Sequence, residues 1–304
     1  MRVFLYRVYQ FIMKYMVRMI MWKNATLIEG ENSILKIPEL LKTHGFSRVL
    51  MVTDKNITTL GLTIPLLATL EKNKVDCFVY DETVPNPTID NIEVALILYK
   101  EKSCQAIIAF GGGSPMDCAK GVAARVARPR KSVPQLRGLL KVLKRVPVII
   151  AVPTTAGTGS ETTIAAVVSN PHTHEKYAVN DPFLVPKYAV LDPLITVGLP
   201  PNITSTTGID ALTHAVEAYI GRSNTVETNR CAREAVKLIS DNLYKAYSDG
   251  KNIQARANML KASFLAGVAF TKAYVGYVHA LAHTLGGYYR IPHGLANAVI
   301  LPYM

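Results

Sequence analysis

The feature that most constrains this fold is an apolar run that ends in three consecutive glycines. Residues 106–110 (AIIAF) have the pattern of a buried strand, and glycines 111–113 follow directly. Ser114 suits a helix N-cap, with Pro115 at the first helical position and Asp117 at the third. A strand, a glycine loop and a helix N-terminus in this order favour a cradle for nucleotide phosphates. A tight strand-to-helix turn without a ligand is the alternative interpretation.

Apolar runs alternate with helical patterns from residue 25 to residue 197. We predict strands at 49–52, 77–80, 106–110 and 146–152, and helices at 64–72 and 89–101. Uninterrupted apolar strands separated by helices indicate βαβ units in a parallel sheet that is covered on both faces. Helical patterns then dominate at 207–220, 225–248 and 253–274. The sequence thus predicts an α/β domain at 25–197 and an all-helical domain at 198–304.

The first 24 residues form a basic, apolar extension. Its charges at Arg2, Arg7, Lys14 and Arg18 leave no uninterrupted apolar span, which argues against a transmembrane segment and a signal peptide. Several of these charges share one stripe of a helix, so we predict an amphipathic helix that packs on protein. Contact of residues 1–22 with a membrane surface is the alternative.

The chain carries a formal net charge of +12, from 34 Lys and Arg against 22 Asp and Glu. The charge is not interleaved with aromatic residues as in nucleic-acid sites, so no nucleic-acid partner is expected. None of the four cysteines has metal-finger or redox spacing. This pattern predicts a reduced, cytoplasmic location. A homo-oligomer is expected only because most soluble oligomers are homo-oligomers, and no sequence feature specifies it.

Two further polar segments follow predicted strands. Asp54 comes just after the strand at 49–52, and residues 153–161 (PTTAGTGSE) follow the strand at 146–152. Ligands of open α/β sheets bind at the carboxyl ends of strands. A carboxylate there suits a ribose diol, and the hydroxyls and bare amides suit a ribose or a nicotinamide amide. Both segments also have the composition of helix caps.

The helical half contains a constellation with metal-ligand chemistry. Asp210 and His214 are four residues apart, as are His279 and His283, and His293 follows. On a helix this spacing places both side chains of a pair on one face. One carboxylate and three imidazoles suit Fe²⁺ or Zn²⁺. Spacing alone leaves four histidines for three positions.

Four segments together resemble the iron-containing (group III) alcohol dehydrogenase family. They are GGGSPMDCAK, PTTAGTGSE, GIDALTHAVEAY and HALAHTLGGYYRIPHGLANAVILPYM. The resemblance covers residues 25–304. It implies a Rossmann-like nucleotide-binding domain followed by a helical metal-binding domain, in a dehydroquinate-synthase-like architecture. It also implies that the C-terminal part of the helical domain is missing.

The resemblance also implies roles for individual residues. The metal ligands would be Asp210, His214, His279 and His293, and His283 would face substrate and nicotinamide as a proton relay. Cofactor contacts would come from Asp54 and Asn86, from Gly112, Gly113 and Ser114 at the pyrophosphate, from Thr154, Thr155 and Thr158 beside the nicotinamide, and from Lys176. The carboxylate of Asp54 favours NAD over NADP, because it repels a 2′-phosphate.

The expected function is metal-dependent hydride transfer between a primary alcohol or aldehyde and NAD(P). Fe²⁺ is the expected metal and Zn²⁺ the alternative; NAD is the expected dinucleotide and NADP the alternative. Two other functions stay open at this point. One is a glycerol-dehydrogenase-like polyol oxidoreductase on the same fold, and the other is an inactive, truncated nucleotide-binding protein.

Overall fold

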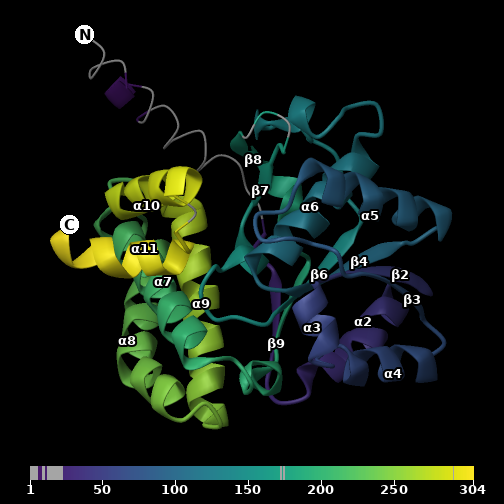
Figure 1. Cartoon of the computed structure of the whole chain (residues 1–304), viewed down its shortest axis with the longest axis horizontal. Coiled ribbons are helices and arrows are strands. Elements are labelled where there is room, and N and C mark those ends of the chain that lie inside the picture. The colour runs from purple at the N-terminus through teal and green to yellow at the C-terminus, as the bar shows by residue number, and fades with distance from the viewer. Residues whose placement is uncertain (1–5, 9–10, 12–22, 172, 174, 290) are drawn as a thin grey trace.

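A computed structural model of the chain describes residues 6–8, 11, 23–171, 173, 175–289 and 291–304. Most of the predicted N-terminal amphipathic helix lies outside the described residues. The described chain divides into an α/β half and a helical half that lie side by side (Figure 1). The predicted combination of a parallel α/β domain and a helical domain is confirmed.

The α/β half is built on a six-stranded sheet in which every paired strand is parallel to its neighbours. Its order is β1 (Thr26–Glu29), β9 (Tyr188–Leu191), β6 (Val148–Pro153), β4 (Ala106–Gly111), β2 (Arg48–Val52) and β3 (Asp76–Tyr80). The central strand β4 is buried along its whole length. This explains its continuous apolar sequence, because both of its faces are covered.

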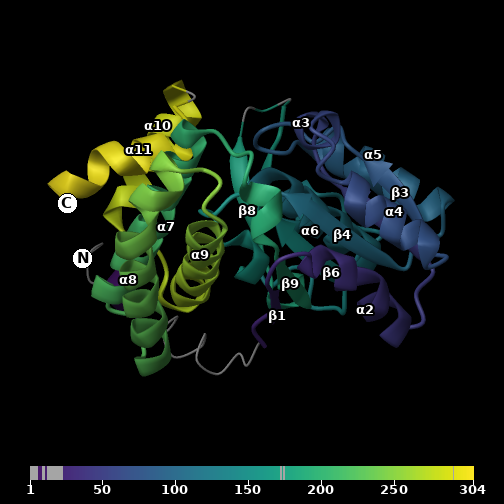
Figure 2. The same cartoon turned by 90° about the horizontal axis from the view of Figure 1, so that it is seen from below.

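Helices cover both faces of this sheet (Figures 1 and 2). On one face lie α2 (Ile37–Thr43), α3 (Lys55–Thr59) and α4 (Ile64–Lys72), and on the other lie α5 (Ile89–Glu101) and α6 (Gly113–Ala127). Alternate strand residues serve the two cores. Met51 packs with Leu66 of α4 in one cluster, whereas Leu50 packs with Ile92 of α5 in the other.

A second, three-stranded sheet, whose strands come before and after β6 in the chain, was not predicted. Its order is β5 (Gly138–Leu139), β8 (Lys176–Asn180) and β7 (Ala165–Ser169), with β7 and β8 antiparallel. The strands are short and only alternately buried, so they lack the long apolar runs that mark the main sheet. This small sheet carries Lys176.

The helical half consists of α7 (Pro201–Ile220), α8 (Val226–Ser248), α9 (Ile253–Ala273), α10 (Tyr277–Tyr289) and α11 (His293–Ile300). The first of these begins six residues before the predicted position, because Pro201 takes its first position, where the fixed φ of proline suits a helix start. Alanines fill its contacts with α8 and α9, among them Ala211, Ala215 and Ala232.

Within the described part of the chain, no single helix is both long and apolar enough to cross a membrane. Helices α9 and α10 are long and apolar enough only when they are taken together, and the chain bends by 100° between them.

The loop after β6 packs closely against the helical half. A Cβ atom on Gly157 would lie 2.7 Å from the carbonyl oxygen of Thr207 on α7. A Cβ atom on Gly159, which has a φ of 59°, would lie 2.7 Å from the Cα atom of Gly267 on α9. Both positions therefore need glycine for close approach of two backbones. The polar loop at 153–161 is thereby packed against α9 and against α7, the helix that carries Asp210 and His214.

Candidate functional site

Helix α7 directs three polar side chains to one buried stripe. Asp210, His214 and Glu217 follow at intervals of four and three residues, which places them on the same face of the helix. All three are buried, with at most 5% of their surface exposed. A helix face that buries two carboxylates and an imidazole needs partners for them, because burying an unpaired charge costs free energy.

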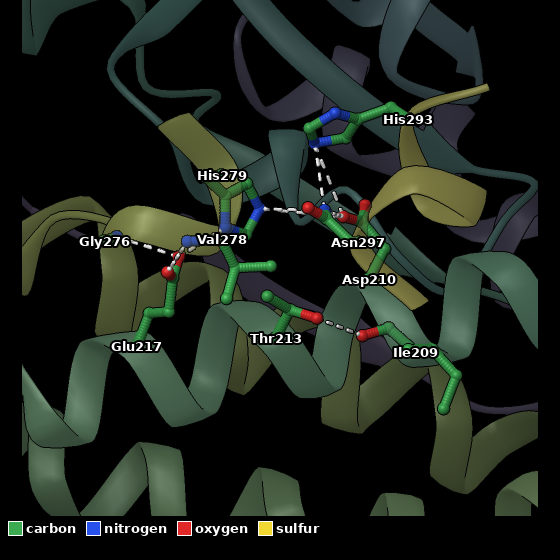
Figure 3. A network of polar contacts seen from close by, with 9 residues as sticks. All are labelled: Ile209, Asp210, Thr213, Glu217, Gly276, Val278, His279, His293 and Asn297. Carbon is green, nitrogen blue, oxygen red and sulfur yellow. Dashed lines mark hydrogen bonds and ion pairs between the residues drawn. The ribbon is translucent and has the colours of Figure 1, made fainter. Parts of the chain in front are cut away.

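The partners come from α10 and α11. His279 on α10 and His293 at the start of α11 point toward Asp210 (Figure 3). Their Nε2 atoms lie 3.7 and 3.5 Å from Oδ1 of Asp210. One ligand atom from each of Asp210, His214, His279 and His293 lies within 4.8 Å of the other three. The four residues predicted as ligands are thus brought to one point, from three helices.

The electrostatics of this point suit a divalent cation. Burial would raise the pKa of Asp210, but the surrounding imidazoles of His214, His279 and His293 hold it at about 2. Burial lowers the pKa of His214 to about 3, so this ring is neutral at neutral pH. An ionised carboxylate and imidazole lone pairs are the donor set that Fe²⁺ and Zn²⁺ take. The residues therefore fit such an ion.

His279 is the exception among the ligand-type histidines. Burial alone would lower its pKa, but the carboxylate of Asp210 close to Nε2 and the hydrogen bond with Glu217 at Nδ1 raise it above the ordinary value. A proton and a cation therefore compete for its Nε2 atom, since metal ligation needs the neutral ring.

The fourth histidine of the constellation, His283, lies outside the cluster. Its ring stacks on that of His293, with centroids 4.8 Å apart and an angle of 29° between the planes. The residue as a whole is exposed, but the surrounding protein partly desolvates its ring. This desolvation, together with the nearby His293, His279 and Lys176, lowers the pKa of His283 to about 4. The geometry therefore places His283 beside the four clustered residues, as a neutral ring at neutral pH.

Two polar residues of this site, Glu217 and Asn297, were not predicted from the sequence. Glu217 accepts a hydrogen bond from Nδ1 of His279 at 2.6 Å, and Asn297 donates one to Oδ1 of Asp210 at 2.5 Å. Glu217 lies seven residues after Asp210, and Asn297 lies four after His293. Helical periodicity could have found both, because these intervals return a side chain to the same helix face.

Most of the residues predicted to contact a dinucleotide lie just after β2, β4 and β6, whereas Asn86 follows β3 and Lys176 lies on β8. The two loops after β4 and β6 touch: Cβ atoms on Gly112 and Gly113 would lie 3.4 Å from Oγ1 of Thr155 and 3.2 Å from Cγ2 of Thr158. Thr154 is buried, and its amide donates to the carbonyl of Gly111 at 3.1 Å. This edge thus presents the bare backbone that a phosphate or nicotinamide amide needs.

Ser114 has a different local role from the predicted one. The N-cap of α6 is Gly112, which is extended and makes no side-chain cap, so the prediction of Ser114 as N-cap is wrong. Instead, the Ser114 hydroxyl accepts a hydrogen bond from the amide of Asn86 at 3.1 Å. Asn86 in turn accepts from Nζ of Lys176 at 2.5 Å. Ser114, Asn86 and Lys176 therefore form one polar chain at the sheet edge.

Asp54 follows β2 and is the N-cap of α3. Its Oδ1 atom accepts hydrogen bonds from the amides of Asn56 and Ile57, at 3.0 and 3.2 Å. The interpretation of Asp54 as a helix cap is thus confirmed. The second carboxylate oxygen takes no part in the cap, so a ribose role is compatible with it.

A charged network ties α6, the helix that follows the glycine loop, to the polar loop, and it too was missed. Nζ of Lys120 donates to the carbonyls of Ser160 and Thr163, at 2.7 and 2.9 Å. Asp117 accepts from the hydroxyl of Ser160 at 3.0 Å. Burial shifts both groups toward neutrality, lowering the pKa of Lys120 to about 8 and raising that of Asp117 to about 6. The two loops are therefore held in one fixed relation.

Comparisons with known proteins agree with this geometry. The chain is 41% identical over 275 residues to alcohol dehydrogenase 4 of Schizosaccharomyces pombe, covering 90% of this chain and 65% of that protein. It is 40% identical over 277 residues to 1,3-propanediol dehydrogenase of Klebsiella pneumoniae, covering 90% of this chain and 71% of that one. The chain thus spans about two thirds of the length of these relatives.

Solved structures share the fold. A 1,3-propanediol oxidoreductase superposes with a TM-score of 0.89 at 39% identity, covering 93% of this chain and 74% of that one. Sulfoacetaldehyde reductase from Bifidobacterium kashiwanohense, solved in complex with NAD⁺, has a TM-score of 0.85 at 30% identity, covering 93% and 76%. Residues 24–193 match the family "iron-containing alcohol dehydrogenase", and residues 204–304 match "Fe-containing alcohol dehydrogenase family, C-terminal". The chain belongs to the iron-containing alcohol dehydrogenase family.

Proposed function

We propose that this protein is an oxidoreductase that transfers a hydride between a primary alcohol or its aldehyde and a nicotinamide dinucleotide. The observation that carries the proposal is the convergence of ligand atoms from Asp210, His214, His279 and His293 within 4.8 Å. Lys176, at the predicted dinucleotide edge, is close enough for its positive charge to lower the pKa of His283 and of His293. The dinucleotide edge and the metal-type cluster are therefore neighbours. The relatives named for alcohol and 1,3-propanediol dehydrogenase support a small alcohol as substrate.

The four clustered residues would hold Fe²⁺, with Zn²⁺ as the alternative. Such an ion would supply Lewis acidity, which favours the alkoxide over the alcohol at the reacting oxygen. His283, exposed beside His293 and neutral at neutral pH, is placed to accept and pass on the proton that the alcohol loses. The loop at 153–161, which packs against α7 and α9, would exclude water from one side of the site.

The sheet edge would hold NAD. The amides of Gly112, Gly113 and Ser114 would face the pyrophosphate, and Thr154, Thr155, Thr158 and Lys176 the nicotinamide side. The free oxygen of Asp54 would accept from a ribose hydroxyl and repel a 2′-phosphate, which favours NAD over NADP. The NAD⁺ complex of sulfoacetaldehyde reductase, at 30% identity, supports this cofactor. A cytoplasmic location and a homo-oligomeric state are further parts of the proposal.

The test is NADH formation by the full chain, loaded with Fe²⁺ or Zn²⁺ without oxygen, on a panel of 1-propanol, 1,3-propanediol and glycerol. Asp210→Asn is the matched control, because it keeps the volume of the side chain and removes its charge. We expect turnover that depends on the cation and is lost in D210N. Preference for glycerol would favour the polyol alternative. Dinucleotide binding without turnover, with or without the cation, would favour the non-catalytic one.

A further inference from the structure

The carboxylate of Glu217 accepts three hydrogen bonds in the interior of the helical half. Its oxygens lie 2.6 Å from Nδ1 of His279, 2.8 Å from the amide nitrogen of Gly276 and 2.7 Å from that of Val278. Figure 3 shows the carboxylate below the first turn of α10, with the three donors directed at it. We infer that Glu217 is a positioning residue, which fixes the tautomer of His279 and ties the start of α10 to α7. The inference rests on the proposed cation site.

The first part of the inference concerns the ring of His279. A carboxylate can only accept, so Nδ1 of His279 carries the hydrogen in this contact. The neutral ring then presents the lone pair of Nε2, which is the atom that faces Asp210 at 3.7 Å. A carboxylate on the far nitrogen of a metal-bound imidazole orients the ring and raises its basicity. Glu217 thus selects the one tautomer of His279 that can bind a cation beside Asp210.

The second part concerns the position of α10. The chain leaves α9 through Tyr274, which has a φ of 68°, and turns by 100° into α10. The amides at a helix start have no acceptor within the helix, and Glu217 supplies acceptors for Gly276 and Val278. A Cβ atom on Gly276 would lie 2.8 Å from Oε1 of Glu217, so this approach needs glycine. The same carboxylate therefore holds both the ring of His279 and the helix that bears it.

A glutamine at position 217 cannot reproduce this arrangement. It offers one oxygen and one NH₂ group to three N–H donors, so one donor must face another. If the NH₂ group faces His279, Nδ1 becomes the acceptor and the hydrogen moves to Nε2, where a cation needs the lone pair. Glu217→Gln keeps the volume of the side chain but removes its charge and changes its hydrogen bonding.

The experiment is Zn²⁺ binding to the cation-free chain, measured by competition with a chelator. We expect Glu217→Gln to weaken the affinity by about 10–100-fold, the usual loss when an outer partner of a metal-bound histidine is removed. The matched control is Glu227→Gln. Glu227 on α8 is a half-exposed carboxylate that pairs with Lys272 at 2.8 Å, and its loss should leave Zn²⁺ affinity unchanged.

A second readout separates positioning from general destabilisation. The ¹⁵N shifts of the His279 ring in the cation-free protein should report hydrogen on Nδ1 in the wild type and a redistribution toward Nε2 in E217Q. Equal Zn²⁺ affinity and an unchanged tautomer in E217Q would overturn the inference and leave the proposed function intact. Absence of both Zn²⁺ and Fe²⁺ binding in the wild type would instead overturn the proposed function.

If E217Q does not fold, Gly276→Ala addresses the same contact with the carboxylate retained. The added methyl group must displace Oε1 of Glu217, so a loss of Zn²⁺ affinity is again expected. Unchanged affinity in G276A would contradict the inference.

Discussion

The side-chain nitrogen of Asn297 lies 2.5 Å from Oδ1 of Asp210. The same nitrogen is 3.3 Å from Nε2 of both His279 and His293. Asn297 is fully buried, so its N–H groups meet the same atoms that converge for a cation. In the absence of a cation, this amide is therefore a main source of hydrogen bonds to the ionised carboxylate of Asp210.

We predict that Asn297→Leu destabilises the cation-free protein by about 1.5–3 kcal/mol, the usual value of a hydrogen bond to a charged group. The loss should be smaller with Zn²⁺ bound, because the cation then neutralises Asp210. Urea unfolding with and without Zn²⁺ measures both values. Asn258→Leu is the control, since Asn258 donates to Asn242 at 2.9 Å in a neutral pair. An equal loss in both states for N297L would contradict the prediction.

A pH effect on stability is expected from Glu161. Burial raises the pKa of this carboxyl from 4.5 to about 7. The folded protein therefore holds the proton more tightly than the unfolded chain does. The stabilising contribution is complete below pH 4.5 and is lost as the pH rises through about 7.

Glu161→Gln should abolish this titration. As the pH rises from 5 to 8, the wild type should lose stability relative to E161Q, by an amount on the order of 2–3 kcal/mol for this pKa shift. Urea unfolding at the two pH values measures the difference, and comparison across pH removes any constant effect of the substitution. Glu71→Gln, at an exposed position of α4, is the control. A difference between E161Q and wild type that stays constant across pH would refute this origin.

Much of the site follows from local pattern, because its chemistry sits on regular elements. The pair Asp210 and His214 could be placed on one helix face from their spacing, and the glycine triplet could be placed after a buried strand. Long-range contacts are different in kind. That Ser114 accepts from Asn86 rather than capping its own helix depends on how the loop at Pro85–Pro87 lies against α6, and no local periodicity encodes this.

The missed carboxylates and amides illustrate the same limit. Glu217 shares a helix stripe with Asp210 and His214, but only the 100° turn between α9 and α10 brings His279 to it. Lys120 lies in an apolar stretch of α6, and its acceptors lie 40 or more residues away in the chain. Sequence spacing can nominate such residues, whereas their partners are set by tertiary packing.

The dinucleotide preference should depend on the charge of Asp54. We predict that Asp54→Asn raises the affinity for NADPH relative to NADH, because the repulsion of a 2′-phosphate is removed. Stability should hardly change, since asparagine and aspartate are equally good N-caps and the cap to Asn56 and Ile57 is kept. Fluorescence titration with each dinucleotide measures the ratio, and thermal unfolding checks the cap. An unchanged ratio would argue against a ribose contact at Asp54.

Substitutions of His283 and His293 should differ in their effects on cation binding and on turnover. The two rings stack at 4.8 Å, yet only His293 has a nitrogen within the four-residue cluster. His293→Gln should therefore lose the cation, whereas His283→Gln should keep it and lower kcat, by about 10²–10⁴-fold if the ring transfers a proton in the rate-limiting step. Metal content and turnover measured on the same preparations test this. His44→Gln is the control for loss of any imidazole, because the His44 ring is hydrogen-bonded to the Tyr188 hydroxyl at 2.9 Å, at the first residue of β9. Equal metal loss in H283Q and H293Q would mean that His283 is itself a ligand.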